Sequence, residues 1–172
     1  MSAFITVIPI IIIRYALLSM LNKEALTRAA YFAPLVGRER IAYWVYQATT
    51  LLILVDLILL KIRIDSDWFY IGVVIYGLGL VLYAISMVDY ARPKTNGINV
   101  NGLYRISRNP MYGAYSICFL GCVLISSSWR LFILLIIFQI SSHWIILSEE
   151  RWCIKKFGED YMRYMNKVRR YI

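Results

Sequence analysis

The chain has 172 residues, of which 60% are hydrophobic and only 17% are charged. Soluble domains carry about 45–50% apolar and about 25% charged residues, so this composition excludes an ordinary water-soluble fold. The net charge is +9, but the basic residues cluster between long apolar runs, which argues against nucleic-acid binding. We therefore expect a single membrane domain over residues 1–172.

Five apolar runs approach the length of about 20 residues that a helix needs to cross a bilayer. They are residues 2–21, 41–60, 68–88, 110–129 and 131–148. The last three contain no Asp, Glu, Lys or Arg, while Arg14 and Asp56 interrupt the first two. Runs of this length and apolarity are too long for strands. The sequence predicts an all-α, polytopic membrane bundle of about five spanning helices with a C-terminal amphipathic helical segment.

The two charges inside predicted spans, Arg14 and Asp56, are functional candidates, because charged side chains at membrane depth are rare. A structural alternative applies to Asp56, which lies near the end of its run. It can reach water there or form an ion pair with Lys61 or Arg63.

Basic residues are distributed unevenly among the segments that connect the predicted spans. Fifteen of the 19 Lys and Arg residues lie in residues 22–40, 89–109 and 149–172. The two alternate connections contribute only Lys61, Arg63 and Arg130. Cytoplasmic loops carry the excess of Lys and Arg, so we expect the N-terminus outside and residues 22–40, 89–109 and 149–172 in the cytoplasm.

Residues 105–110 close the second of these segments and begin the fourth predicted span. Asn109 suits an N-cap and Pro110 the first helical position. Arg105 and Arg108 flank this helix N-terminus, which suits an anion such as a carboxylate. The alternative is that both arginines only satisfy the positive-inside rule.

A polar stripe runs along the fifth predicted span and continues beyond its end. Gln139, His143 and Glu150 fall on one helix face, and Glu149 lies beside them. Two adjacent carboxylates at a membrane boundary repel one another unless a cation compensates. For His143 alone, a satisfied hydrogen bond inside the bundle is the alternative reading. The three cysteines and the single histidine show no metal-ligand spacing, so we expect no metal site.

Beyond this stripe, Gly158 suits the end of a helix. Glu159 and Asp160 then suit the first turn of another short helix. Aromatic and apolar residues at three- and four-residue steps from Phe157 to Val168 form a stripe that can fold back over the cytoplasmic end of the bundle. The alternative is an amphipathic tail that lies on the lipid surface.

These features together resemble a known family. Residues 102–112, Gly-Leu-Tyr-Arg-Ile-Ser-Arg-Asn-Pro-Met-Tyr, are similar to the Arg-(His or Asn)-Pro-x-Tyr signature of isoprenylcysteine carboxyl methyltransferases and phospholipid N-methyltransferases. The double glutamate 149–150 and the tail up to residue 172 resemble the second signature of that family. Gly77-Leu78-Gly79 is similar to a Gly-x-Gly of the phospholipid enzymes. The resemblance covers about residues 76–172.

The resemblance implies a pocket for S-adenosylmethionine that opens to the cytosol. By analogy, Gly77 and Gly79 allow close approach of the cofactor. The loop side of the pocket is lined by Tyr104, Arg108, Asn109 and Tyr112. The amino, ribose or sulfonium end is held by His143, Glu149 and Glu150. The implied catalytic residues are Glu150, near the reaction centre, and Arg170, which orients an anionic acceptor.

The leading hypothesis is therefore a membrane methyltransferase that acts on a lipophilic small molecule or lipid-modified acceptor. The acceptor would be an isoprenylcysteine-like carboxylate, a phospholipid amine, or another apolar acid, amine or thiol. The second hypothesis is an NADPH-dependent membrane reductase of the sterol reductase type, whose loop and tail motifs are related. The third is a non-enzymatic membrane scaffold. Membrane lipid is the expected partner in each case, and the oligomeric state stays open.

Overall fold

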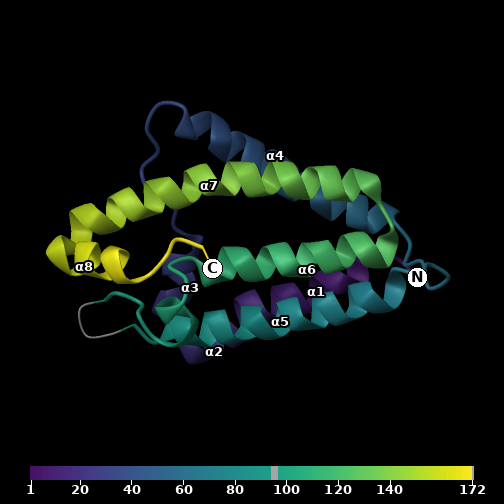
Figure 1. Ribbon diagram of the computed structural model, residues 1–172, viewed down its shortest axis with the longest axis horizontal. Coiled ribbons are helices and arrows are strands. Elements are labelled where there is room, and N and C mark those ends of the chain that lie inside the picture. The colour runs from purple at the N-terminus through teal and green to yellow at the C-terminus, as the bar shows by residue number, and fades with distance from the viewer. Residues whose placement is uncertain (94–96, 172) are drawn as a thin grey trace.

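The computed structural model describes residues 1–93 and 97–171 (Figure 1). These residues are largely helical and contain no named strand. The elements in chain order are the 3-10 helix η1 (Ala3–Thr6), α1 (Val7–Ile11), the π-helical η2 (Ile12–Leu17), α2 (Leu18–Leu21), α3 (Lys23–Ala30), α4 (Glu39–Leu59), α5 (Phe69–Ala91), the 3-10 helix η3 (Gly102–Arg105), α6 (Pro110–Ser126), α7 (Trp129–Phe157) and α8 (Glu159–Lys167). The predicted all-α class is confirmed. Residues 94–96 and 172, which belong to the predicted cytoplasmic segments, lie outside the described residues.

Within residues 1–93 and 97–171, four helical stretches are long and apolar enough to cross a membrane, which makes the chain a multi-pass membrane protein. They are Ala3–Leu21, Glu39–Leu59, Phe69–Ala91 and Trp129–Phe157. The remaining predicted span, α6, is apolar but has only 17 residues. It ends before the predicted residue 129 because Ser127 adopts a left-handed conformation, with φ of 50°. The hydroxyl of Ser128 then accepts a hydrogen bond from the Leu131 amide and caps α7.

The end of α7 follows the predicted pattern. The helix continues through Glu149 and Glu150 to Phe157 without a break. Gly158 separates it from α8 with φ of +56°, a conformation that glycine adopts at little steric cost. Glu159 and Asp160 lie in the first turn of α8, as expected.

The long helices lie side by side in the bundle (Figure 1), and α5 and α6 approach one another closely. A Cβ atom added to Gly79 would lie 2.6 Å from the backbone nitrogen of Cys118. One added to Gly121 would lie 2.5 Å from the Cβ atom of Tyr76. Small residues therefore set the distance between these two helices, as is common in membrane bundles.

At the end of the bundle near Met1, backbone hydrogen bonds and an ion pair connect neighbouring segments. The Ala3 amide donates to the Leu60 carbonyl at 2.9 Å, and the Arg63 amide donates to the Ile125 carbonyl at 3.0 Å. Asp56 forms an ion pair with Arg130, at 2.9 Å between Oδ1 and Nη2. Of the structural alternatives for Asp56, an ion pair does form, but its partner is Arg130 and not Lys61 or Arg63, because α4 packs against α7.

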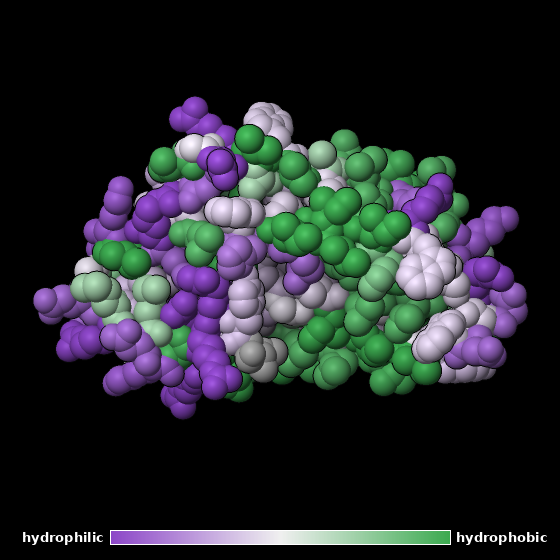
Figure 2. All heavy atoms as spheres, turned by 45° about the horizontal axis from the view of Figure 1, so that its top comes forward, coloured by the Kyte–Doolittle hydropathy of each residue, from purple (hydrophilic) through white to green (hydrophobic). Residues whose placement is uncertain are grey.

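The surface of the molecule has the distribution expected of a membrane protein. Figure 2 shows hydrophobic side chains over the middle of the bundle and hydrophilic side chains at its two ends, more of them at the end with α8. Large apolar side chains such as Ile41, Val74 and Ile140 are more than half exposed. A contiguous apolar surface of this kind suits a lipid environment.

Candidate active site

A cavity of about 650 Å³ lies where α8 and the loop before α6 approach the ends of the long helices. This volume is within the range of small-molecule sites, about 300–1,000 Å³. The predicted site residues on its lining are Tyr104, Arg108, Asn109, Tyr112, Glu149 and Glu150. They come from η3, the loop before α6, α6 itself and α7, so the fold brings together residues that lie up to 46 positions apart in the sequence.

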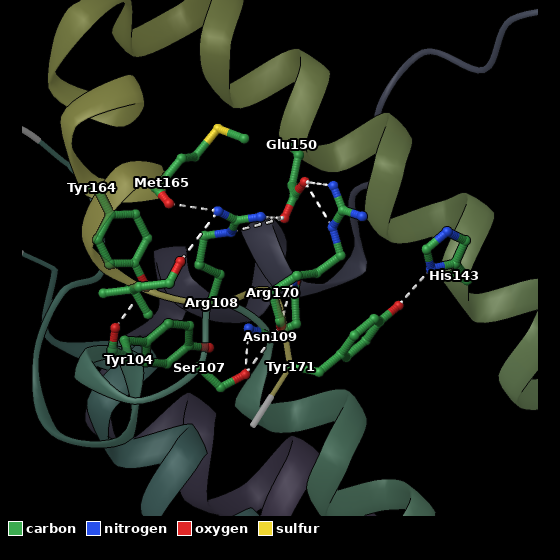
Figure 3. Close-up of polar contacts among 11 residues, drawn as sticks. Tyr104, Ser107, Arg108, Asn109, His143, Glu150, Tyr164, Met165, Arg170 and Tyr171 are labelled. Atoms are coloured by element: carbon green, nitrogen blue, oxygen red, sulfur yellow. Dashed lines mark hydrogen bonds and ion pairs between the residues drawn. The ribbon is translucent and has the colours of Figure 1, made fainter.

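Glu150 is held between two arginines (Figure 3). Its Oε1 atom lies 2.9 Å from Nη2 of Arg108, and its Oε2 atom lies 2.8 Å from Nη2 of Arg170. Glu150 is only 4% exposed. A buried carboxylate needs such charged partners, because the interior solvates it poorly. The two arginines therefore neutralise the negative charge of Glu150.

Arg108 also fastens the C-terminal segment over the cavity. Its Nη1 atom donates to the carbonyl oxygens of Met165, in the last turn of α8, and Val168, at 3.0 and 3.2 Å (Figure 3). These carbonyls lie at the end of a helix, where they lack helical partners. The Arg108 amide donates to the Arg169 carbonyl at 2.9 Å. The expected return of the tail over this end of the bundle is confirmed, since Tyr161 and Tyr164 line the cavity.

Asn109 precedes α6 as predicted, and Pro110 is the first helical residue, but the side chain of Asn109 does not cap the helix. Its Nδ2 atom donates to the Arg170 carbonyl at 3.3 Å. Ser107, which the sequence did not single out, donates to the same carbonyl at 3.2 Å and accepts the Asn109 amide. Asn109 is therefore the N-cap residue as predicted, but its side chain binds the C-terminal segment and makes no capping hydrogen bond to α6.

Glu149 differs from its neighbour in its partners. Its Oε1 atom accepts a hydrogen bond from the Tyr112 hydroxyl at 3.1 Å. None of the ion pairs formed by the described residues includes Glu149. The two adjacent carboxylates therefore differ in environment. Glu150 is neutralised by two arginines, whereas Glu149 lines the cavity and forms no ion pair with any described residue.

Tyr104 and Tyr164 provide aromatic surface at the cavity. The Tyr164 hydroxyl donates to the Tyr104 carbonyl at 2.7 Å. The Tyr104 hydroxyl is buried and has no hydrogen-bond partner among the described residues. Burial raises the pKa of Tyr104 well above its ordinary value, so this hydroxyl stays protonated and can donate. A buried donor without a partner is uncommon in proteins and suits a ligand acceptor atom.

Four predicted site residues do not line this cavity: Gly77, Gly79, His143 and Arg170. Gly79 lies in the contact between α5 and α6, and Gly77 has open space around it. The Nδ1 atom of His143 forms a hydrogen bond with the Tyr171 hydroxyl, at 2.8 Å (Figure 3). Arg170 reaches the site only through its ion pair with Glu150.

Several lining residues were not predicted, and most are aromatic. They include Phe32, Tyr46, Tyr90, Tyr115 and Trp152. The guanidinium of Arg28, another unpredicted lining residue, lies 5.4 Å from the Tyr90 ring centroid. A signal was present for Tyr90, since Tyr76, Tyr83 and Tyr90 recur every seven residues along α5. That spacing marks one helix face inside an otherwise apolar span.

A profile of the phospholipid methyltransferase family matches residues 68–160. This match covers more than half of the chain and includes α5, the loop with η3, α6 and α7. The chain belongs to the phospholipid methyltransferase family. No curated protein and no solved structure matches it significantly.

The family assignment favours the methyltransferase over the reductase and the scaffold. Phospholipid methyltransferases are membrane enzymes that use S-adenosylmethionine to methylate phospholipids or other lipophilic acceptors. The chain is therefore a membrane methyltransferase with S-adenosylmethionine as its methyl donor and a lipid as its class of acceptor. Arg14, Arg28 and α4 line or border the cavity from outside the matched residues.

Proposed function

We propose that the cavity between α7, the loop before α6 and α8 is the site where S-adenosylmethionine binds and methyl transfer takes place. When bound, the cofactor supplies a methyl group carried on a sulfonium cation. The observation that supports this site is Glu149, a carboxylate that faces an aromatic-lined cavity without a cationic partner. Carboxylates and aromatic faces are favourable neighbours of such a cation.

Other polar groups of the cavity fit the same ligand. The unpartnered Tyr104 hydroxyl offers a donor to the ribose or the adenine. The Nε atom of Arg28 is also buried, has no hydrogen-bond partner among the described residues, and suits the cofactor carboxylate. Arg108, which the sequence suggested for that carboxylate, already donates to Glu150, Met165 and Val168. Asn109 and Tyr112 complete the proposed binding side of the loop and α6.

For Glu150 and Arg170 we propose linked roles. Glu150 lines the cavity near the proposed reaction centre, and Arg170 positions it from outside the cavity. Methyl transfer by in-line displacement depends on alignment and on exclusion of water. The network of Arg108, Glu150 and Arg170 serves both needs, because it holds α8 and the residues after it over the cavity. Three further residues do not line the cavity, so their role in cofactor binding stays a prediction from the sequence: Gly77, Gly79 and His143.

We further propose five membrane crossings within one domain. A 17-residue helix such as α6 is about 25 Å long and reaches the lower limit for a span, about 17 residues. The three segments that carry 15 Lys and Arg residues would then share one side. The positive-inside rule assigns that side, with the cavity and the C-terminus, to the cytoplasm and the N-terminus to the exterior. Trp68 and Trp129 would lie at the opposite interface, where tryptophan is enriched.

The proposed acceptor is a membrane lipid or lipid-modified molecule, either an isoprenylcysteine-like carboxylate or a phospholipid amine. Incubation with labelled S-adenosylmethionine and a native lipid extract, followed by mass spectrometry of the methylated products, would identify it. A methylated lipid that forms only with active enzyme supports the proposal. No labelled lipid from any extract fraction would contradict it.

The binding site itself is tested by thermal unfolding of detergent-solubilised protein with S-adenosylhomocysteine, S-adenosylmethionine or NADPH. We expect stabilisation by the first two compounds only. The variant Glu149→Gln should lose at least tenfold in affinity for S-adenosylmethionine, because the unpaired carboxylate disappears, consistent with about 1.5–3 kcal/mol for hydrogen bonds to charged groups. The matched control Glu159→Gln, on the exposed N-terminus of α8, should bind like the wild type. Equal affinity in both variants would remove Glu149 from the site.

A further inference from the structure

Arg14 carries an unpaired positive charge inside a membrane-spanning stretch. It lies in η2, a π-helical turn within the apolar segment Ala3–Leu21. Such turns are rare and frequently occur at functional sites. None of the ion pairs formed by the described residues includes Arg14. Within the described part of the chain, this guanidinium at membrane depth therefore has no carboxylate at ion-pair distance.

The partners of Arg14 are neutral oxygen atoms. Its Nη1 atom donates to the Tyr115 hydroxyl and its Nη2 atom to the Ala29 carbonyl, each at 2.9 Å. The Tyr83 hydroxyl, which is hydrogen-bonded to that of Tyr115, is a further neutral partner of Arg14. The guanidinium has five N–H donors, so some remain for another acceptor. A purely structural role would be to hold the end of α3, where Ala29 lies. That role alone gives no reason for a net charge at this depth, where charge is costly.

Arg14 faces the cavity together with Tyr46, Tyr115 and Met111. We call the part of the cavity lined by these four residues its deep part. Arg14 precedes Leu21, the last residue of α2, by seven positions, which corresponds to about 10 Å along a helix. Arg14 therefore lies below the polar end of the bundle, within the depth of the membrane stretch.

The charges of the cavity are arranged for two ligands of opposite sign. Among the described residues neither Glu149 nor Arg14 forms an ion pair, although both line the same cavity and the charge of Arg14 acts on Glu149 from a greater distance. A cationic methyl donor next to Glu149 would take over the compensation of this carboxylate and leave Arg14 to compensate a negative group on the second ligand. The guanidinium fork matches the oxygens of a carboxylate or a phosphate.

We propose that Arg14 binds an anionic oxygen, carboxylate or phosphate, of the lipophilic acceptor in the deep part of the cavity. This inference rests on the proposed function, because it assumes that the cavity holds both methyl donor and acceptor. It assigns acceptor recognition to a residue of the first membrane stretch, outside the residues matched by the family. The reacting group of the acceptor would then lie between Arg14 and Glu149.

The test uses three amphiphiles that share one chain length and differ in head group: palmitate, hexadecyl phosphate and hexadecanol. Each is titrated into the detergent-solubilised protein saturated with S-adenosylhomocysteine, and thermal unfolding reports binding. Wild-type protein should bind the two anions more tightly than the alcohol. Arg14→Gln should lower the affinity for the anions about ten- to hundredfold, the range for hydrogen bonds to charged groups, and leave hexadecanol binding unchanged. Arg14→Lys should retain part of the anion preference.

The control variant Arg40→Gln removes the same charge from an exposed position in α4 and should bind all three amphiphiles like the wild type. If Arg14→Gln does not fold, Tyr115→Phe, which removes one hydrogen bond to Arg14, should still weaken anion binding. An anion preference that persists without Arg14, or its absence in the wild type, would overturn the inference.

Binding of S-adenosylhomocysteine is measured separately and should be unchanged in Arg14→Gln. A loss of this binding with intact anion preference would mean that Arg14 serves the cofactor carboxylate, which also overturns the acceptor assignment. If the wild type binds anionic amphiphiles through Arg14 but binds no S-adenosylhomocysteine, the proposed function fails and the anion site stands. The two failures are therefore distinguishable.

Discussion

The contact between α5 and α6 and the site end of α7 hold the molecule together in opposite ways. Glycines bring α5 and α6 together, and an added Cβ atom at Gly72, Gly79 or Gly121 would lie 2.5–2.8 Å from a neighbouring atom. At the end of α7 that carries Glu150, long charged side chains connect separate elements, as Arg108 does between Glu150 and the end of α8. The first contact leaves no room for a ligand, and the second surrounds a cavity of about 650 Å³.

This difference shows how one bundle combines a fixed packing distance with a ligand site. Close backbone packing depends on shape and has few alternative arrangements. A network of ion pairs around a cavity depends on charge balance, which a charged ligand alters when it binds. We therefore expect substitutions in the α5–α6 contact to change stability alone, and substitutions around Glu149 and Glu150 to affect stability and cofactor binding together.

The largest effect is expected when charge balance at the site is removed. Glu150→Ala leaves Arg108, whose side chain is only 9% exposed, without its carboxylate. Loss of one partner from a buried ion pair costs about 3–5 kcal/mol, and the partial exposure of Arg170 places the expected loss near the lower value. Thermal unfolding in detergent measures it, with Glu159→Ala as the control. Wild-type stability of Glu150→Ala would show that the network does not hold the C-terminal segment.

A smaller effect is expected in the helix contact. Gly79→Ala places a methyl group against the backbone of Cys118, and such overpacking costs about 1–3 kcal/mol. Gly77→Ala is the matched control, because nothing lies within 4 Å of its added Cβ atom. Alanine there should be neutral or stabilise the helix by up to about 1 kcal/mol. Should Gly77→Ala instead weaken binding of S-adenosylhomocysteine at unchanged stability, the Gly-x-Gly would regain its predicted cofactor role.

The smallest change in stability is expected at Tyr104. Its hydroxyl is buried without a partner, so Tyr104→Phe should leave the ligand-free protein unchanged or stabilise it by about 1 kcal/mol. Affinity for S-adenosylhomocysteine should fall, because the hydroxyl is the proposed ligand donor. The same measurement on Tyr70→Phe, an exposed tyrosine of α5, gives the baseline. Unchanged affinity in Tyr104→Phe would mean that its hydroxyl has no ligand partner.

Much of the fold was readable from the sequence because hydropathy and helix-end chemistry are local. The runs that became α4 and α5 were located within three residues at each end, the predicted span 131–148 lies inside the longer α7, and Gly158 was correctly placed between two helices. The end of α6 was missed, since the left-handed Ser127 follows from how α6 and α7 meet rather than from serine itself. The partner of Asp56 was missed for the same reason, because helix pairing is not local.

The part of the cavity lining that the sequence predicted comes from two local segments, residues 104–112 and 149–150. Tyr104, Arg108, Tyr112, Glu149 and Glu150 all line the cavity. The wall from the N-terminal half, with Tyr46 and Arg28, was not predicted, because nothing local reveals which helices meet there. Arg14 was flagged only by its charge in an apolar run. Its position on the cavity required the tertiary structure.

The length of α7 has a consequence for the lipid environment of the enzyme. Its 29 residues form one uninterrupted helix, about 44 Å long, which is both a membrane span and the element that carries Glu149 and Glu150. A hydrophobic helix adapts to bilayer thickness by tilting. When the membrane-spanning part of a rigid helix tilts, the part that extends beyond the membrane moves with it. The position of the two glutamates relative to the loop before α6 is thereby coupled to bilayer thickness. Acyl-chain length in the surrounding membrane is therefore expected to influence turnover even for lipids that are not themselves methylated.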